Sequence, residues 1–240
     1  MDMRRLKKAE MFSREEYYAA VQDSGKTLSE DALSYSLRKA VDNGVIMHVG
    51  RDQYAFADNK ALYDYEYSEV ARAVASEIQN SYPVADYRIL ELMQMNPFVN
   101  HQFAHNTVFV YVEKDLVEFV FDSLKLLYPG KILLKPTIEN YYRYLVDDEI
   151  VVLRLPSESP KGKTEIWHSC IEKVLVDMYS DKILASLISE SEYKEVYEEV
   201  FRRYYIDVKS MLRYARRKGA YDRYREILMK YAPRAIKATL

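Results

Sequence analysis

Two small groups of residues in this chain have types and spacings that could support metal chemistry. His101 and His105 stand four residues apart, the spacing of a zinc-binding pair on a helix. The segment NPFVN just before them favours a loop, and the glutamate of the helical metalloprotease motif is absent. Local hydrogen bonding is therefore the expected role of this pair, and no metal site is predicted.

The second group is the acidic run Asp147-Asp148-Glu149, which precedes a strand-like segment. Carboxylates in such a place can hold Mg²⁺ in nucleases. No Glu-x-Lys pattern follows on the strand, so an acidic turn at a strand start is the simpler interpretation. A nuclease-like enzyme that uses these three acids is kept as an alternative.

Nucleophilic catalysis has little support. Cys170 has only His168 close by in the sequence, and two residues that are two apart on a helix point away from each other. The chain has no phosphate-binding loop, dinucleotide fingerprint or nucleophile elbow. The sequence therefore predicts no catalytic residue, no cofactor and a protein that is not an enzyme.

Composition is typical of a globular protein. The chain has 240 residues, of which 49% are hydrophobic, with only 6 Gly and 7 Pro. Its single cysteine excludes a disulfide framework and fits a reducing cytoplasm. No apolar run approaches the length of a membrane span, and the basic start MDMRRLKKAEMF lacks the apolar core of a signal peptide. A cytoplasmic protein without a membrane partner is expected.

Charge is distributed unevenly along the chain. Residues 1–60 have a net charge of 0, residues 61–200 of −11 and residues 201–240 of +9. The basic end could pack on the acidic middle or contact nucleic acid, and the acidic middle could instead dock a protein partner. These interpretations stay open at the level of sequence.

The front of the chain carries the signals of two capped helices. Ser13 and Glu16 have the spacing of a capping box, with Phe12 and Tyr17 as a hydrophobic staple. A second helix is predicted to start at Ser29. Its inward-facing residues follow helical spacing: Leu33, Leu37, Ala40 and Val41. Gly44 stands where a glycine in the left-handed conformation would cap the end of the helix.

Two β-rich arms follow, at 45–49 and 53–56, around Gly50-Arg51-Asp52. A helix followed by such a hairpin is the order that a winged helix needs to place both on DNA. The polar face of the helix and the tip of the hairpin would then supply the DNA contacts, namely Ser34, Tyr35, Arg38, Lys39 and Arg51. The basic residues at positions 4, 5, 7 and 8 could serve as an additional arm. A solvated helix face is the alternative, and only two clear helices are seen where the usual motif has three.

The rest of the chain reads as a sheet covered by helices. Helices are predicted over 68–79, 115–128 and 137–146, and strands over 86–92, 107–113, 131–135 and 149–154. The first of these helices would have Val70, Ala73, Val74 and Ile78 on one side. After a loop at 156–164, helical spacing runs from Trp167 to Met178 and from Tyr193 to Tyr204, then over 208–219 and 220–231.

The sequence thus predicts an α+β protein with a small N-terminal winged helix-turn-helix over residues 1–60. A larger mixed α/β domain follows over 61–240, with a sheet-containing part at 61–155 and a helical part at 165–240. Arg213, Arg216, Arg217 and Lys218 near the end of one helix are candidates for a second nucleic-acid contact.

The order of these parts resembles a known family. NGVIMHVGRDQYAF at the end of the front region, IEKVLVDMYSDK (171–182) and YYIDVKSMLRYARRKG (204–219) look like segments of AbiEi-type antitoxins of bacterial abortive-infection, type IV toxin–antitoxin systems. The likeness covers most of the chain. It departs at the hairpin tip, which reads GRDQY where the usual pattern is G-R-G-x-Y.

The resemblance implies a DNA-binding autorepressor that recognises inverted repeats in its own promoter. It also implies an antitoxin role in phage defence, in which the C-terminal part counters a nucleotidyltransferase-type toxin without forming a stable complex. Carried onto this sequence, the DNA contacts would again be the helix and hairpin residues named above.

Overall fold

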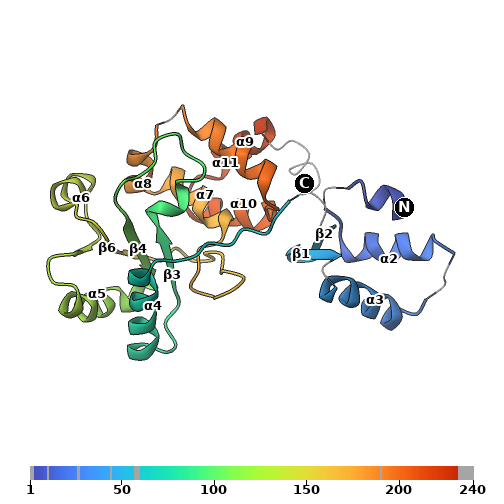
Figure 1. Cartoon of the computed structure of the whole chain (residues 1–240), viewed down its shortest axis with the longest axis horizontal. Coiled ribbons are helices and arrows are strands. Elements are labelled where there is room, and N and C mark those ends of the chain that lie inside the picture. Colours follow the sequence, from blue (N-terminus) through green and yellow to red (C-terminus); the bar gives the residue numbers. More distant parts are fainter. Residues whose placement is uncertain are drawn as a thin grey trace. The chain divides into compact units, whose positions relative to one another are not determined.

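The computed structural model describes residues 3–9, 11–25, 28–43, 45–56, 60–189 and 191–231. The chain divides into two compact units. Unit 1 comprises residues 1–62 together with Arg202–Asp207, and unit 2 comprises residues 63–201 and 208–240. The protein is of the mixed α+β type, as predicted (Figure 1). No helix in the described part of the chain is long and apolar enough to cross a bilayer.

In its described residues, unit 1 contains three helices and a hairpin: α1 (Met3–Leu6), α2 (Arg14–Gln22), α3 (Glu30–Asp42), β1 (Ile46–Gly50) and β2 (Gln53–Phe56). The predicted capping box is present: the Ser13 hydroxyl accepts from the Glu16 N–H at 3.2 Å, and the Glu16 carboxylate accepts from the Ser13 N–H at 2.7 Å. Ser29 caps α3 as predicted. Gly44, expected to end that helix, lies outside the described residues.

Helix α1 was not predicted. It occupies the basic segment interpreted as a DNA-contacting arm, and it is anchored because Leu6 is completely buried in the core of unit 1. That core joins all three helices to the hairpin, through Leu6, Phe12, Tyr17, Ala20, Val21, Leu33, Leu37, Ile46, Tyr54 and Phe56. Phe12 also pairs with Tyr54 by two backbone hydrogen bonds of 2.8 Å, adding a third extended segment beside β2.

A segment from far along the chain completes unit 1. Ala61 and Tyr204 form a parallel bridge, and the Tyr205 hydroxyl donates to the Phe56 carbonyl at 2.8 Å. Tyr205 shares a second small core with Val49 and Ala55 of the hairpin. Tyr204 therefore does not continue the preceding helix, as its spacing had predicted, because its backbone pairs with Ala61.

Unit 2 is built on a four-stranded sheet in the order β3-β4-β6-β5. Strands β3 (Tyr87–Glu91) and β4 (Thr107–Val112) are antiparallel, whereas β6 (Glu149–Arg154) runs parallel to β4 and to β5 (Ile132–Leu134). Nearly every residue of β3, β4 and β6 is buried, as expected for strands covered on both faces.

Helices α4 (Glu69–Ser81) and α5 (Val117–Leu127) cover one face of the sheet, and α7 (Ile171–Ser180) lies on the other (Figure 1). The inward side of α4 differs from the prediction. Val74 and Ile78 are buried as expected, but Ala73 is exposed and Ala71 and Ala75 are buried in its place.

Four of the remaining helices follow the predicted order: α6 (Ile138–Tyr144), α9 (Tyr193–Arg203), α10 (Val208–Arg217) and α11 (Tyr221–Tyr231). Helix α8 (Lys182–Leu187) was not predicted, and the structure also contains the short 3₁₀ turns η1 (Leu92–Met95) and η2 (Lys114–Leu116). The predicted start of α7 at Trp167 is wrong. Trp167 precedes α7, because its carbonyl accepts the N–H of Ile89 at 2.8 Å and its ring packs on the sheet core.

Candidate nucleic-acid interface

The polar face of α3 is set by the burial of its opposite face. Leu33 and Leu37 are inside the core at 3% and 4% exposure. Because a helix turns 100° per residue, the side chains one and two positions further along turn away from the core. Tyr35 is 65% exposed, and Arg38 and Lys39 are exposed, while Ser34 is half-buried.

The hairpin tip is held against the start of α2. Strands β1 and β2 pair from Ile46↔Phe56 to His48↔Tyr54, and a bulge then shifts the register before Gly50. Arg51 and Asp52 form the exposed turn. The Asp52 carboxylate accepts from the Arg14 N–H at 3.4 Å and lies 3.9 Å from the Arg14 Nε.

Asp52 adopts a left-handed backbone conformation, with a φ of 56°. This is the position at which the AbiEi-type pattern has glycine. Aspartate is among the few non-glycine residues that adopt this region readily, because its short polar side chain can bond locally. The hairpin tip therefore keeps the geometry that a glycine would favour, and it gains a negative charge.

A cavity of about 420 Å³ opens beside α3. Its polar lining comes from three elements: Arg14 from α2, Ser34 and Arg38 from α3, and His48 from β1. The His48 ring lies 5.0 Å from the Tyr54 ring, which forms part of the floor with Leu37 and Val41. Residues that carry two guanidinium groups, an imidazole and a hydroxyl thus line one concave surface. Donors of this kind suit phosphate oxygens or acceptors on base edges.

The structure brings only part of the predicted set together. Ser34 and Arg38 line the cavity, whereas Tyr35, Lys39 and Arg51 are exposed side chains that do not line it. Arg14 and His48 were missed. Their positions on a helix and a strand were predictable, but their convergence with Arg38 depends on how α2, α3 and the hairpin pack.

Several of the basic residues near the end of α10 pair with acidic side chains of the same unit. Arg217 forms an ion pair with Glu158, and Arg213 lies 3.9 Å from the same carboxylate. Lys218 is 14% exposed and lies 3.3 Å from Asp177. Arg216 packs over the Tyr221 ring at 4.5 Å. At these positions the basic end packs on the acidic middle, which was one of the two open interpretations.

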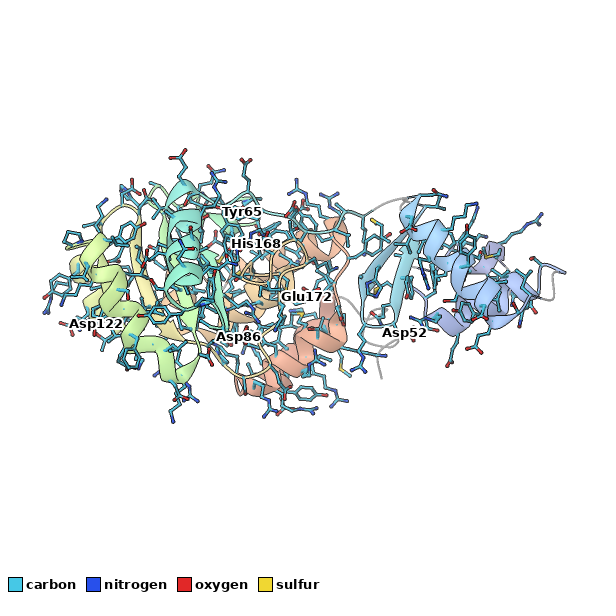
Figure 2. All side chains as sticks on the ribbon, turned by 90° about the horizontal axis from the view of Figure 1, so that it is seen from below. Asp52, Tyr65, Asp86, Asp122, His168 and Glu172 are labelled. Carbon is cyan, nitrogen blue, oxygen red and sulfur yellow. The ribbon has the colours of Figure 1, made fainter. Side chains whose placement is uncertain are left out.

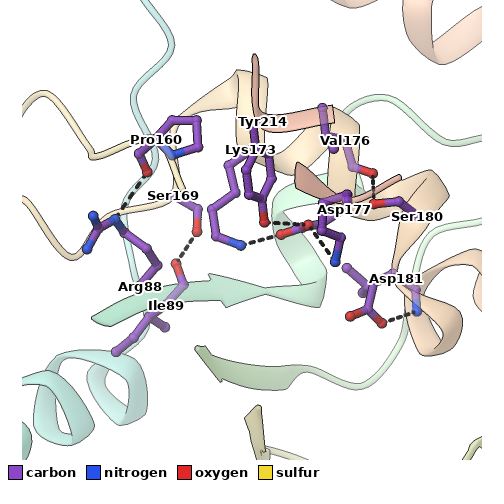
Figure 3. A network of polar contacts seen from close by, with 12 residues as sticks. Arg88, Ile89, Pro160, Ser169, Lys173, Val176, Asp177, Ser180, Asp181 and Tyr214 are labelled. Carbon is purple, nitrogen blue, oxygen red and sulfur yellow. Dashed lines mark hydrogen bonds and ion pairs between the residues drawn. The ribbon is translucent and has the colours of Figure 1, made fainter. Parts of the chain in front are cut away.

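Two of the three segments that carry the resemblance, 171–182 and 204–219, meet in a buried network (Figure 3). The Asp177 carboxylate of α7 accepts hydrogen bonds from Lys173 and, at 2.9 Å, from the Tyr214 hydroxyl of α10. Lys173 and Asp177 have no exposed side-chain surface, and the Lys173 ammonium lies 3.6 Å from the centre of the Tyr111 ring.

Ionisation in this network is set by opposing effects. Burial lowers the pKa of Lys173. Burial also opposes ionisation of Asp177, but Lys173, Lys218 and the hydrogen bonds together outweigh it and hold the pKa of this carboxyl low. A paired and hydrogen-bonded charge in the interior is tolerated where an unpaired one is not. The hydrogen bond from Tyr214 to Asp177 in this network therefore links α10 to α7.

The other chemical candidates do not assemble into a metal site. Within the described residues, no group of three or more His, Cys, Asp or Glu side chains lies close enough to hold a metal ion. His105 Nδ1 lies 3.7 Å from the Asp147 carboxylate, which also accepts the Asn106 N–H at 3.2 Å. His101 is an exposed side chain 3.9 Å from Glu192. These are local polar contacts.

Glu149 is buried at 1% exposure, and burial raises its pKa to about 7. Cys170 stands at the N-cap position of α7, outside the helix on which it had been placed, and burial raises the pKa of its thiol well above the usual value. A thiol held in its neutral form is a poor nucleophile.

Comparison with known families gives one match. A model described as "Family of unknown function (DUF6577)" matches residues 32–234, from the first turn of α3 to beyond α11. No curated protein matches the chain.

Proposed function

Because the chain belongs to the DUF6577 family, whose function is unknown, we propose a function from the geometry of its own residues. We propose that it is a transcriptional autorepressor and antitoxin of a type IV toxin–antitoxin system. In this proposal unit 1 binds the promoter DNA as a winged helix. Unit 2 counters a nucleotidyltransferase-type toxin without forming a stable complex.

The order of elements in unit 1 supports a winged helix. A short helix (α1) is followed by the extended residue Phe12, two helices and a hairpin whose second strand pairs with Phe12. The arrangement supplies three helices, of which the third, α3, immediately precedes the hairpin. In a helix-turn-helix protein this last helix enters the major groove.

The observation that carries the proposal is the convergence of Arg14, Arg38 and His48 beside the exposed face of α3. Guanidinium groups bind phosphate oxygens and the guanine edge with paired hydrogen bonds. Each phosphate contact adds affinity that falls as salt rises, without adding sequence information. The net charge of 0 over residues 1–60 does not oppose binding if the cations face the duplex and the acids face away.

The experiment is a fluorescence-anisotropy titration of the full chain with a labelled duplex from upstream of its own coding sequence. A scrambled duplex of equal length and composition is the matched control. Specific binding that weakens steeply between about 50 and 200 mM salt is expected. Failure to bind the upstream duplex at low salt would remove the basis for DNA recognition.

The antitoxin role rests on the resemblance of the α7 and α10 segments, and it is tested separately. The chain is co-expressed with the product of the adjacent gene, provided that gene encodes a nucleotidyltransferase-like protein, and growth is followed. Restored growth is expected with both the wild type and Arg38→Ala, because the proposed antitoxin surface lies in unit 2. Growth arrest that the wild type does not relieve would contradict this half of the proposal.

A further inference from the structure

Another cavity, of about 730 Å³, lies within unit 2, and we call it the α4 cavity. Its walls come from the segment that leads into α4, from α4 itself and from the loop that precedes α7. Figure 2 labels Tyr65 in the first of these walls and His168 in the third. The cavity therefore brings together two segments that are about one hundred residues apart in the chain, as the bond between Tyr67 and Ser169 also shows.

Four aromatic side chains line the α4 cavity and contact one another. The centre of the Tyr67 ring lies 4.8 Å from that of Trp167 and 4.4 Å from that of His168, and Tyr65 meets Tyr67 edge to face at 5.0 Å. Tyr65, Trp167 and His168 are partly exposed. Burial lowers the pKa of His168, so this ring is largely neutral at pH 7 and does not repel a cation. The faces of aromatic rings attract cations.

Two walls of the α4 cavity are attached to strand β3. The Tyr67 hydroxyl donates to the Ile89 carbonyl at 3.0 Å and accepts the Ser169 N–H at 2.8 Å. The Trp167 carbonyl accepts the Ile89 N–H at 2.8 Å. These bonds hold the aromatic rings in place without a ligand, and such preorganisation lowers the entropic cost of binding.

Gly162 sets the shape of the loop wall. A Cβ atom at this position would overlap the Glu165 carbonyl oxygen and would lie 2.5 Å from the His168 Cβ. A side chain does not fit there, so glycine allows the loop to fold back closely on itself. The folded loop presents Glu165, Trp167 and His168 to the same cavity.

The α4 cavity also has an excess of negative charge. Three exposed acidic residues line it, namely Asp64, Glu66 and Glu165. In the described part of the chain, none of these carboxylates forms an ion pair with a basic side chain. With Arg72 of α4 as the basic residue of the lining and His168 neutral, three negative charges and one positive charge leave a net charge of −2.

We infer that the α4 cavity binds a guanidinium group, the chemical group at the end of an arginine side chain. A guanidinium is planar, so it stacks on aromatic rings, and it donates paired hydrogen bonds to carboxylates. It is also more weakly hydrated than an ammonium, so it is removed from water more readily. The cavity offers both kinds of contact on residues that line one hollow.

Other classes of ligand use only part of this lining. Phosphates and nucleotides would be repelled by the three carboxylates, and an uncharged ring would leave these carboxylates unused. A quaternary ammonium would attract the rings but has no N–H to donate. The inference goes beyond the proposed function and does not depend on it, because all residues named for the α4 cavity belong to unit 2.

The test is a titration of the full chain with N-acetyl-arginine amide. Trp167, the only tryptophan, lines the cavity, so its emission reports occupancy, and calorimetry measures the same binding independently. N-acetyl-citrulline amide is the matched control compound, because it has nearly the same shape without the charge. We expect saturable binding of the arginine compound, and binding at least about tenfold weaker for the citrulline compound. N-acetyl-lysine amide and tetramethylammonium should bind at least about fivefold more weakly than the arginine compound.

A variant without the three carboxylates tests the site itself. The combined substitution of Asp64→Asn, Glu66→Gln and Glu165→Gln keeps the size of the side chains and should weaken binding of the arginine compound by at least about tenfold. Circular dichroism reports whether the variant is folded.

The matched control variant combines Asp115→Asn, Glu118→Gln and Asp122→Asn. These are exposed acids of η2 and α5 that do not line the cavity, and their replacement changes the net charge of the chain by the same amount. This variant should bind the arginine compound within about twofold of the wild type, because surface charges at a distance are screened by salt.

Selective binding of the arginine compound that is lost only in the cavity variant supports the inference. No binding to the wild type overturns it, as do equal binding of the citrulline, lysine or tetramethylammonium compounds and an equal loss in both variants. Tighter binding of N-acetyl-arginine amide than of free arginine identifies an arginine within a peptide as the source of the group, and the reverse order identifies a free compound. If these titrations fail while the upstream duplex binds, this inference fails alone.

Discussion

Asp52 shows that an aspartate can occupy a left-handed backbone position at a hairpin tip and bring a negative charge with it. Its φ of 56° lies where glycine is favoured, and the resembling pattern has glycine there. The bonds to Arg14 hold the carboxylate at the hairpin tip. They also divert part of the positive charge of Arg14, a residue that lines the proposed DNA-binding cavity.

Asp52→Asn is therefore expected to tighten DNA binding. Asparagine also adopts the left-handed region, so the turn is retained while a negative charge beside the proposed DNA contacts is removed. A surface charge interaction contributes about 0.2–1 kcal/mol, so the gain is on the order of fivefold at most at low salt. Anisotropy titrations measure it, with Asp122→Asn in unit 2 as control. Weaker binding by Asp52→Asn would show that the carboxylate itself positions a DNA contact.

Glu149 is a buried acid with an incomplete set of partners. Its side chain is 1% exposed, and one carboxylate oxygen has no hydrogen-bond partner. Burial raises its pKa to about 7, from an ordinary value near 4.5. Between these values the folded chain keeps a proton that the unfolded chain releases. Its contribution to stability is therefore present below about pH 4.5 and is lost as the pH rises through about 7.

Glu149→Gln is expected to remove this pH dependence, because the amide stays neutral. The variant should be more stable than the wild type at pH 8, by up to about 3 kcal/mol, and the difference should shrink toward pH 5. Urea unfolding followed by Trp167 emission measures both free energies. A constant difference between the two proteins across this range would show that Glu149 titrates normally.

The apolar and polar faces of α3 follow from its amphipathic spacing. Helix α2 adds Arg14 to the same cavity, and the spacing of residues does not predict this. Arg38→Ala and Arg14→Ala should each weaken binding to the upstream duplex. The loss is about 1–3 kcal/mol where the side chain reads a base and less where it contacts phosphate. A phosphate contact is recognised by a salt slope reduced by about 1.

Arg72→Ala provides the control for both arginine substitutions, since Arg72 is an exposed arginine of α4 in unit 2. Its binding should equal that of the wild type. If neither Arg14→Ala nor Arg38→Ala changes the affinity, the cavity beside α3 is not the DNA-binding surface.

Asp177 is the countercharge of Lys173, which is buried one turn earlier on the same helix, α7. Asp177→Asn leaves Lys173 buried without a countercharge, so a loss of about 3–5 kcal/mol is expected. Adding Lys173→Met removes the buried cation and should recover part of that loss. Urea midpoints of the two single variants and the double variant form the cycle. Losses that simply add would argue against coupling between the two side chains.

The division into two units does not follow the order of the chain. Residues 1–62 need Arg202–Asp207 to complete unit 1, and Tyr205 covers Val49 and Ala55 of the hairpin. The chain therefore leaves unit 1 after the hairpin and returns to it between α9 and α10. Unit 1 thus combines the N-terminal segment, which the helix and hairpin signals predicted over residues 1–60, with Arg202–Asp207.

Tyr205→Ala tests this dependence. Removing a buried aromatic side chain costs about 3–5 kcal/mol, and the loss should appear in unit 1. Hydrogen exchange of the β1 and β2 amides should accelerate, while the Trp167 unfolding transition in unit 2 changes less. Tyr205→Phe removes the hydroxyl that donates to the Phe56 carbonyl and should cost about 1 kcal/mol. Equal exchange in the wild type and Tyr205→Ala would mean that the hairpin is stable without this segment.

Local signals in the chain were sufficient to place most elements. Three examples are the capping box at Ser13, the apolar spacing of Leu33 and Leu37, and the apolar strand over 107–112. Each depends on residues that are close together in the chain, so the sequence alone predicts it. The boundaries that failed, at Trp167 and Tyr204, are positions where a distant backbone partner ends the pattern.

Contacts between distant parts of the chain required the folded arrangement. The meeting of Arg14, Arg38 and His48 depends on how three consecutive elements pack. The contact of Asp177 with Tyr214 and the return of Tyr205 to the hairpin join elements far apart in sequence. Spacing encodes which face of a helix is apolar, but it does not encode which other element covers that face. Packing geometry and the pairing of buried polar groups decide that choice, because they involve the whole chain at once.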